Sequence, residues 1–544
     1  MPQPANQVAI LAGIVAAALC LAACGSSSSS STAVTKAGSA TAGSAEIALA
    51  NHSPATDPSA PPSGNLIFAM AAPVSSNSLY VDTLTNDVAT WRAWWEYLVR
   101  PSVSGTSFDP QLATSWSVSN NDKSYVFHLR HNVKFTNSEP FTAADVLYSW
   151  HNAFTLKTST LTFLESRIAS MTAPNPYTVE VKFKQPWPYL LGEICCDMAA
   201  VLPHELVQRE GYQKYIKDPV GTGPFIYGHV NPGVSLTVTR NPNYWEKGYP
   251  KLNSITFTSY PGDTARATAV EGGRADIAES PPPNEIPQLE DNSNLSVDVF
   301  NSAEVWNIAF NTRRAPFKNE LIRRAISLGI DRDAIVKVGL FGTAEPANTN
   351  LVGPPALTDQ DTKDNFYPYD PTLAKKLVEE SGLKTPIKMT LQISNSTVQT
   401  AIGEVVKANL AKLGIDVTVN QVDLNTEENT LGQGQYFSTT DEWGDYQPDP
   451  SIQPEFAVNP NYCCDSYFTY YDSRSEIAAL NAAIAATNPT QRQQLFDDVQ
   501  RDMSQSAQVI PLFFPELTYV TTKKLAGFFA YPNNLYAYEQ WQLK

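Results

Sequence analysis

The sequence predicts an α/β protein, because segments with the period of helices interleave with segments that alternate like strands. A short apolar run opens the pattern, and two strand-like and three helical segments follow; in chain order they are 66–70, 124–129, 177–183, 321–330, 401–413 and 475–486. Gly414 ends the 401–413 helix, and the strand-like run Val417-Thr418-Val419 comes next. This helix-to-strand unit is typical of α/β folds.

Length and composition place the chain among globular proteins that do not bind nucleic acid. It has 544 residues, of which 42% are hydrophobic, so it can build the cores of about two or three domains. The net charge of −16 and the pI near 4.9 exclude nucleic acid as a partner, because binding to phosphates depends on Lys and Arg.

The N-terminus has the pattern of an exported lipoprotein. The apolar stretch from Val8 to Cys20 is too short to span a membrane, and Leu21-Ala22-Ala23-Cys24 with a serine run after it resembles the bacterial lipobox. We therefore predict a lipoprotein signal peptide at 1–24, with Cys24 lipidated on the outer face of a bacterial cell membrane. An ordinary signal peptide with a chance cysteine is the alternative. Two acyl chains would hold the protein firmly.

Residues 25–64 are predicted to form a disordered linker. This segment consists largely of Ser, Ala, Thr, Gly and Pro, a composition that cannot bury a core. The folded protein would therefore be tethered to the membrane but free to move.

Short motifs spread over nearly the whole chain carry a resemblance to a known family. They are LATSW at 112–116, YVFHLR at 125–130, FTAADV at 141–146, GTGPF at 221–225, RNPNYW at 240–245, EGGRADI at 271–277, FNT at 310–312, YDP at 369–371 and IPLF at 510–513. In this order they resemble the family 5 extracellular solute-binding proteins, which serve peptide and nickel ABC importers.

The resemblance implies a two-lobe fold of the periplasmic-binding-protein type. Lobe I would comprise 65–302 and 509–544, with a subdomain inserted into it, and lobe II would comprise 303–508. The lobes would close on a solute by a hinge motion, and the solute would stabilise the closed form. Such a cleft combines apolar and aromatic walls with few polar anchors.

The resemblance also points to a ligand anchor at Asp445. In the family, an aspartate followed by an aromatic residue and a Pro-containing turn pairs with the α-amino group of a bound peptide, and Asp445 is the matching position. One carboxylate in an apolar cleft makes physical sense, because a buried ammonium needs an opposite charge. Trp443, Tyr446 and Trp306 would form aromatic walls. The alternatives are a surface turn for Asp445 and core packing for the aromatic residues.

A second set of candidate ligand-binding residues follows a predicted strand that ends near 393. Ser394 and Asn395 offer hydrogen-bonding groups for a peptide backbone or for sugar hydroxyls, and a plain polar loop is the alternative. Since no Arg occurs between 391 and 399, a clamp for the ligand's carboxylate is not visible there.

Two cysteine doublets, Cys195-Cys196 and Cys463-Cys464, are candidates for disulfides. Thiols outside the cytoplasmic membrane tend to be oxidised, and we favour two vicinal disulfides or partial oxidation. A bridge between the doublets would tie the lobes together, and a thiolate metal site is a further alternative. The six His residues are scattered without ligand spacing, so we assign no metal and no cofactor.

The sequence thus predicts a carrier and not an enzyme. The motifs G-x-S-x-G, H-E-x-x-H and the Walker loop are missing from the sequence, and we assign no catalytic residue. We expect a monomeric lipoprotein that captures oligopeptide-like solutes and delivers them to a separate ABC permease and ATPase. The alternatives are a carrier for oligosaccharide or a nickel or haem chelate, a sensor that signals without transport, and, less favoured, a glycoside hydrolase with paired carboxylates such as Asp445 and Asp449.

Overall fold

The computed structural model describes most of the chain after residue 50. The described residues are 51, 53–74, 77–79, 85–102, 107–119, 121–156, 161, 163–196, 199–351, 365–444, 451–458, 469–471, 473–532 and 534–544. Residues 45–544 form one compact unit. The signal peptide predicted at 1–24, with Cys24, lies outside the described residues. Within the part of the chain that is described, we find no helix with the length and apolarity needed to cross a bilayer.

One large sheet forms the centre of the molecule. Its strands follow the order β17-β16-β18-β14-β19-β12-β1-β11-β10-β8. In addition, β9 pairs with β10, and β13 and β15 pair with β19. We call the following strands the first half-sheet: β1 (Asn65–Met70), β8 (Phe225–Ile226), β9 (Val230–Asn231), β10 (Ser235–Arg240), β11 (Ser254–Ser259), β12 (Ile277–Glu279) and β13 (Leu295–Asn301). The second half-sheet contains β14 (Glu304–Phe310), β15 (Ala344–Pro346), β16 (Ile387–Ser394), β17 (Ile415–Val422) and β18 (Ser438–Gly444).

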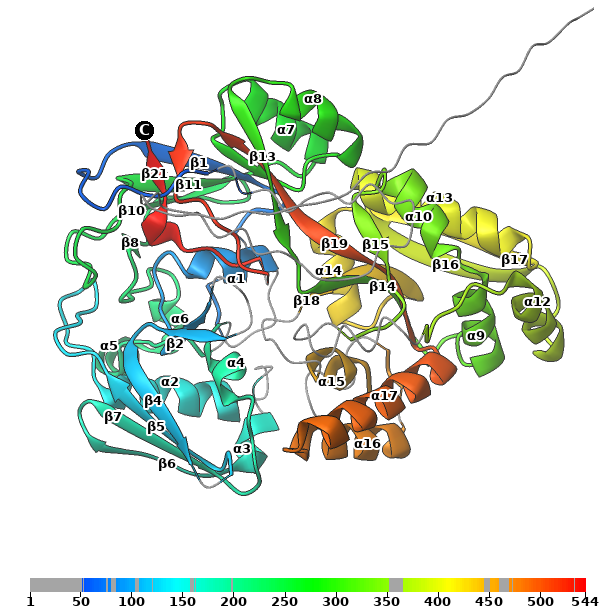
Figure 1. The fold of residues 1–544 in the computed structure, drawn as a ribbon, viewed down its shortest axis with the longest axis horizontal. Coiled ribbons are helices and arrows are strands. Elements are labelled where there is room, and N and C mark those ends of the chain that lie inside the picture. Colours follow the sequence, from blue (N-terminus) through cyan, green and yellow to red (C-terminus); the bar gives the residue numbers. More distant parts are fainter. Residues whose placement is uncertain are drawn as a thin grey trace, which may run out of the picture. The chain divides into compact units, whose positions relative to one another are not determined.

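The long strand β19 (Val509–Thr522) joins the two half-sheets. Its residues 509–515 pair with β14 and β15, whereas 516–522 pair with β12 and β13 (Figure 1). The lobe boundaries proposed at 302/303 and 508/509 stay a prediction. The pairing favours a crossing inside β19, because the first half of this strand shares its hydrogen bonds with the second half-sheet.

Parallel strands linked by helices organise both half-sheets. In the first, β1 pairs in parallel with β11 and β12, and helix α7 (Asp263–Glu271) connects those two strands. In the second, β16 pairs in parallel with β17 and β18, and α13 (Thr397–Ala411) connects β16 to β17. The predicted helix 401–413 and the strand after Gly414 are thereby confirmed. The carboxyl ends of parallel strands are where open α/β sheets bind ligands.

A separate antiparallel sheet forms a subdomain within the first part of the chain (Figure 1, cyan). Its strands are β4 (Ala113–Ser119), β5 (Ser124–Leu129), β6 (Ile168–Asn175) and β7 (Thr178–Phe183), in the order β4-β5-β7-β6. Alternate residues of β5 are buried, and Phe127 contacts Trp150 of α2 (Ala143–Thr155) edge to face at 5.8 Å between ring centroids. The strands predicted at 124–129 and 177–183 are confirmed, because one face packs against α2 and the other faces solvent.

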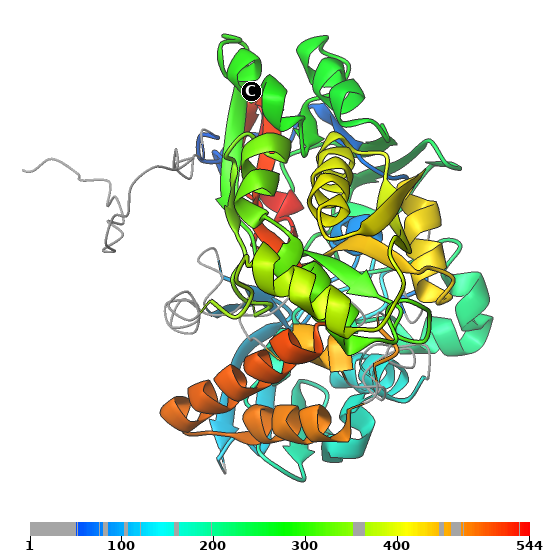
Figure 2. The same ribbon diagram turned by 90° about the vertical axis from the view of Figure 1, so that its right-hand side faces the viewer.

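Further helices surround the sheets. They are α1 (Thr85–Trp91), α3 (Phe163–Arg167), α4 (Leu190–Ile194), α5 (His204–Glu210), α6 (Tyr212–Tyr215), α8 (Ile286–Glu290), α9 (Glu320–Gly329), α10 (Arg332–Gly339), α12 (Pro371–Glu380), α14 (Leu424–Gly432), α15 (Ile452–Val458), α16 (Arg474–Ala485) and α17 (Pro489–Ser506). Short pairs β2 (Val99–Pro101) with β3 (Phe108–Pro110), and β20 (Leu525–Ala526) with β21 (Gln542–Leu543), complete the fold, together with 3-10 turns η3 (Pro283–Glu285) and η4 (Tyr538–Gln540). Figure 2 shows α16 and α17 side by side. The helices predicted at 321–330 and 475–486 correspond to α9 and α16.

The last part of the predicted linker is ordered, which corrects the expectation of disorder up to residue 64. The carbonyl of Pro54 accepts from the Gly527 N–H at 2.8 Å, and the Ser63 N–H donates to the Lys251 carbonyl at 2.7 Å. Lys251 is buried, and its ammonium donates to the carbonyls of Pro58 and Ala60 at 2.6 and 2.8 Å. The segment thus replaces the missing apolar surface with backbone hydrogen bonds to distant residues, which composition alone does not reveal.

The GTGPF motif is explained by close backbone packing. A Cβ atom on Gly221 would lie 1.8 Å from the Trp94 carbonyl oxygen, and one on Gly223 would lie 2.7 Å from the Trp94 carbonyl carbon. The Gly223 N–H donates to that same carbonyl oxygen at 3.0 Å. These glycines let the backbone at 221–223 touch the backbone of Trp94, a role that only a residue without a side chain can fill.

A buried carboxylate, Glu96, lies near this contact. Its side chain accepts from the Tyr244 hydroxyl at 2.8 Å and from the Trp245 indole N–H at 2.9 Å, and the residue is fully buried. Burial raises the pKa of Glu96 to about 7, although the hydrogen bonds from its neighbours lower it. Tyr244 and Trp245 of the RNPNYW motif are therefore bound to a carboxylate that lies 148 and 149 positions earlier in the chain.

Replacing Glu96 with Gln should stabilise the protein relative to wild type more at pH 8 than at pH 5. The folded-state pKa of Glu96 lies above its unfolded value of 4.5, so the stability contributed by the protonated form is complete below pH 4.5 and is lost as the pH rises through 7. The difference in unfolding free energy between Glu96→Gln and wild type should grow by about 2 kcal/mol between these pH values. Urea unfolding at both pH values measures it, and an equal difference at pH 5 and pH 8 would contradict the assignment.

Candidate functional site

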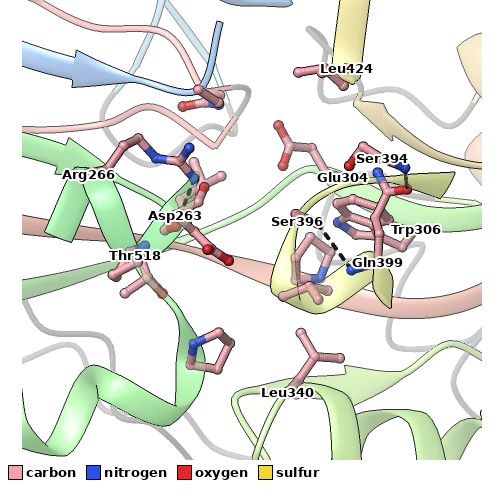
Figure 3. Close-up of a pocket in the computed structure, with 18 of the residues that line it drawn as sticks. Asp263, Arg266, Glu304, Trp306, Leu340, Ser394, Ser396, Gln399, Leu424 and Thr518 are labelled. Carbon is pink, nitrogen blue, oxygen red and sulfur yellow. Dashed lines mark hydrogen bonds between the residues drawn. The ribbon is translucent and has the colours of Figure 1, made fainter. Parts of the chain in front are cut away.

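A cavity of about 270 Å³ lies where the carboxyl ends of the parallel strands from the two half-sheets meet. From the first half-sheet, residues 71–73 follow β1, 261–266 follow β11 and 280–286 follow β12. From the second, 394–399 follow β16 and 423–424 follow β17. Residues of β19 between Phe513 and Tyr519 line the cavity between these two sides. Figure 3 shows Asp263 and Arg266 on one side and Ser394, Ser396 and Gln399 on the other.

Acidic side chains dominate the charge around the cavity. Its lining includes four carboxylates and one guanidinium: Asp263, Glu304, Asp423, Glu516 and Arg266. Carboxylates this close to a partly enclosed space create a negative potential there, because low-dielectric walls focus the field. The cavity therefore favours a ligand with a positive charge.

The guanidinium of Arg266 is committed to the protein backbone. The residue is 3% exposed, and its nitrogens donate to the carbonyls of Glu279 and Tyr260, both at 2.9 Å, and of Ser280 and Pro261 at 3.1 and 3.3 Å. Burial lowers the pKa of Arg266, whereas the nearby carboxylates Glu279 and Asp263 raise it. Arg266 thus fastens the loops after β11 and β12 to each other, and its donors are turned toward those loops.

Aromatic and apolar groups form part of the wall. Trp306 of β14 is half-buried and stacks on Phe513 of β19, with ring centroids 5.8 Å apart and planes at 15°. Tyr519 of β19 also lines the cavity, and its hydroxyl bonds to Asn534 and lies 3.1 Å from the Tyr536 hydroxyl. Leu340 and Leu424 add aliphatic surface. The site combines flat apolar surface with charge, as small-molecule sites generally do.

A hydrogen-bonded network fixes the polar loop on the side of the second half-sheet. The Gln399 side-chain oxygen accepts from the Ser394 N–H at 2.5 Å and from the Thr440 hydroxyl at 2.6 Å, and its amide nitrogen donates to the buried Glu427 at 3.3 Å. The Ser396 hydroxyl caps α13 by accepting from the Gln399 N–H at 3.1 Å (Figure 3). The turn at 394–396 is thereby held in one conformation beside the cavity.

The structure brings three of the predicted ligand-binding residues to this cavity. Trp306, Ser394 and Asn395 all line it. Asp445 and Tyr446 lie outside the described residues, and of Trp443 only the backbone in β18 is described. The described end of β18 nevertheless lies beside the site, because its last residue, Gly444, pairs with the lining residue Glu304.

The cysteine predictions are answered for one doublet. A disulfide joins the buried Cys195 and Cys196, which is compatible with both favoured arrangements, two vicinal disulfides and partial oxidation. Cys463 and Cys464 lie outside the described residues. In the part of the chain that is described, no cluster of three or more His, Cys, Asp or Glu side chains is placed to hold a metal ion.

Sequence reasoning missed all five charged lining residues, namely Asp263, Arg266, Glu304, Asp423 and Glu516. A partial signal existed for Asp423, which follows the predicted strand at 417–419 and stands at the start of a helix, where acidic residues are common. Nothing in the sequence indicated that the starts of α7 and α13 face one cavity, because this depends on how the two half-sheets meet.

Comparison with known proteins agrees with this geometry. The model of the bacterial extracellular solute-binding proteins, family 5, matches residues 107–461. The chain belongs to this family. The predicted fold, a two-lobe α/β fold of the periplasmic-binding-protein type, is confirmed by the solved structures described next.

Relatives of this family 5 protein cover most of its length. It is 29% identical over 443 residues to the glutathione-binding protein GsiB of Escherichia coli K12, covering 80% of this chain and 86% of GsiB. The structure of DppA from Helicobacter pylori with the peptide STSA has a TM-score of 0.79 at 24% identity, covering 89% of this chain and 98% of DppA. A dipeptide-binding protein from Pseudoalteromonas sp. SM9913 with Met-Leu gives 0.81 at 21%, covering 88% and 100%.

Replacing Arg266 with Lys in this family 5 protein should destabilise it by about 1 to 3 kcal/mol. A lysine ammonium cannot serve four carbonyls that are spread around a planar guanidinium, so buried acceptors would lose their donors. Thermal or urea unfolding measures the loss. Arg274→Lys, at an exposed position after α7, is the matched control and should change stability by less than about 0.5 kcal/mol. Equal stability of the two variants would show that the backbone contacts of Arg266 contribute little.

Proposed function

We propose that this protein captures a short peptide-like solute with a protonated amino group outside the cytoplasmic membrane and delivers it to an ABC importer. The observation that carries the proposal is the acidic cavity between the carboxyl ends of the two half-sheets. Its lining has four carboxylates, and its guanidinium is bound to backbone carbonyls.

The charge balance supports a cationic group on the solute. An ammonium moved out of water needs a nearby opposite charge, and the cavity offers several. Arg266 is the one cation among the described lining residues, and its four backbone hydrogen bonds leave it poorly placed to clamp a carboxylate. Recognition by the amino end of the solute therefore fits the lining better than recognition by its carboxyl end.

Size and similarity support a short solute. A volume of about 270 Å³ lies just below the range of roughly 300 to 1,000 Å³ for small-molecule pockets. The name of GsiB specifies glutathione, a tripeptide, and the DppA structure contains a tetrapeptide. Both support a peptide-like solute, although these proteins share less than 30% of their residues with this chain.

Asp445 remains our proposed anchor for the amino group. It follows the strand position at which Gly444 pairs with Glu304, and both Glu304 and Trp306 line the cavity. A carboxylate that enters from this strand end would add to the negative potential beside an aromatic wall. Trp443 and Tyr446, on either side of it in the sequence, are the proposed aromatic partners.

Closure would bring the two lobes together around the solute. The proposed lobes, 65–302 with 509–544 and 303–508, are connected by β19 and by the short link between β13 and β14. Because only these two connections are named between the lobes, a hinge motion about them is feasible, and the bound solute would stabilise the closed form. Lipidation of Cys24 would hold the monomeric protein near its permease and ATPase, which are separate chains.

Native mass spectrometry of the protein from Ala45 onward, the start of the compact unit, tests this function first. We expect the gently purified protein to carry a co-purified solute of narrow mass range, which denaturation releases as short peptides with free amino termini. A released sugar, or a metal chelate such as the Ni(L-His) seen with the structurally similar NikZ of Campylobacter jejuni, would overturn the peptide assignment and leave the carrier role intact.

Asp445→Ala should weaken peptide binding by about 3 to 5 kcal/mol, because it would leave a buried ammonium without its counter-charge. Isothermal titration calorimetry with a peptide identified by mass spectrometry measures the loss. Asp416→Ala, at an exposed position on β17, is the control and should bind like wild type. Unchanged affinity of Asp445→Ala would remove this residue from the anchoring role.

A further inference from the structure

Asp263 makes a direct hydrogen bond from one side of the cavity to the other. Asp263 is the first residue of α7, the helix that connects β11 and β12 of the first half-sheet, and it is 8% exposed. One carboxylate oxygen, Oδ1, accepts from the N–H of the adjacent Thr264 at 2.8 Å. The other, Oδ2, accepts from the N–H of Thr397, the first residue of α13 in the second half-sheet, at 3.0 Å. One carboxylate therefore joins two helix starts that are 134 residues apart.

The bond gives the Thr397 N–H an acceptor that α13 does not provide by itself. The first N–H groups of a helix have no partner within the helix. The Ser396 hydroxyl accepts from the Gln399 N–H, and the Ser396 carbonyl accepts from the Thr400 N–H. The N–H of Thr397 instead takes its acceptor from the opposite side of the cavity. The carboxylate also lies at the positive ends of two helix dipoles, each of which favours a negative charge.

The turns that lead into α7 and α13 are each fixed by hydrogen bonds within their own side of the cavity. Arg266, one turn after Asp263, donates to the Tyr260 and Pro261 carbonyls and so fixes the turn that leads into α7. On the other side, Gln399 binds the Ser394 N–H and the Thr440 hydroxyl, which fixes the turn that leads into α13. Because each turn is held within its own side, a movement of the two sides relative to each other would break the bond.

We propose that Asp263 is a positioning residue that clasps the two sides of the cavity in the closed form, and that it favours closure before any solute is bound. This inference rests on the proposed function in one respect, namely that the two sides separate when a solute enters or leaves. The clasp lies within the cavity lining itself. Loss of the carboxylate should therefore favour the open form and speed the release of a solute.

The clasp differs from a direct solute anchor. Both oxygens of Asp263 accept backbone N–H groups in this structure, so its carboxylate is already used within the protein. Asn at this position would keep one carbonyl oxygen that can accept from Thr397 but would remove the negative charge, whereas Ala would remove both. Comparison of the two variants therefore separates the effect of the hydrogen bond from the effect of the negative charge.

The test compares wild type with Asp263→Ala and Asp263→Asn by hydrogen exchange resolved to single amides and by small-angle scattering, both without added solute. In Asp263→Ala we expect the Thr397 amide to exchange about tenfold faster or more, as loss of a charge-assisted hydrogen bond implies, and the radius of gyration to rise. Asp263→Asn should lie between Ala and wild type in both measurements. If Asp263→Ala fails to fold, Asp263→Asn carries the comparison with wild type.

Asp370→Ala is the matched control. Asp370 caps α12 by accepting from the Thr372 and Leu373 N–H groups of its own helix, so its loss should speed exchange there and leave Thr397 and the scattering unchanged. The clasp is overturned if Asp263→Ala leaves Thr397 exchange as in wild type, or if exchange rises while the radius of gyration stays the same. Neither readout needs a solute, so failure of the clasp and failure of the peptide assignment are told apart.

Discussion

The hydrogen bonds of β19 connect the two half-sheets, and the position of the cavity depends on them. Residues 509–515 of this strand complete the second half-sheet, and residues 516–522 complete the first. Phe513, Glu516 and Tyr519 lie around the crossing and line the cavity. Since one strand belongs to both halves, a relative motion of the halves has to bend or twist this strand, and the groups beside the crossing are displaced least. The loops at the carboxyl ends of the other strands then carry the change in cavity shape.

Buried arginines in this protein are paired mainly with backbone carbonyls. Arg266 binds the loops at one side of the cavity, and Arg332, at the start of α10, donates to the Pro511 carbonyl of β19 at 2.6 Å and to the Tyr367 carbonyl at 3.1 Å. Burial lowers the pKa of Arg332 to about 10, and the partial charges of the carbonyls compensate the guanidinium. Because the donors of Arg266 are bound to carbonyls, this guanidinium makes none of its hydrogen bonds named above to a lining carboxylate, although its charge still acts on Asp263.

Several regular elements with strong periodicity were predictable from the sequence, whereas most of the charged lining of the cavity was not. Period-two alternation identified β5 and β7 because one face of their sheet packs on α2, and Gly414 marked the end of the α13 unit. Trp306, Ser394 and Asn395 line the cavity, and their role in binding stays a prediction. Asp263 and Arg266 were missed, since their roles come from contacts with Thr397 and with the carbonyls of residues 260–280, which leave no periodic signal.

The sequence by itself determined the fold class and the family, because apolar periodicity and short motifs are local properties that can be read without coordinates. It was wrong about residues 53–64, which have no large apolar side chain other than proline but find hydrogen-bond partners in the C-terminal segment and at Lys251. Only the tertiary structure decided that four carboxylates surround one cavity, that its arginine is used internally, and that the starts of α7 and α13 meet at Asp263. These are relations between residues more than a hundred positions apart, and they are fixed by how the half-sheets pack around β19.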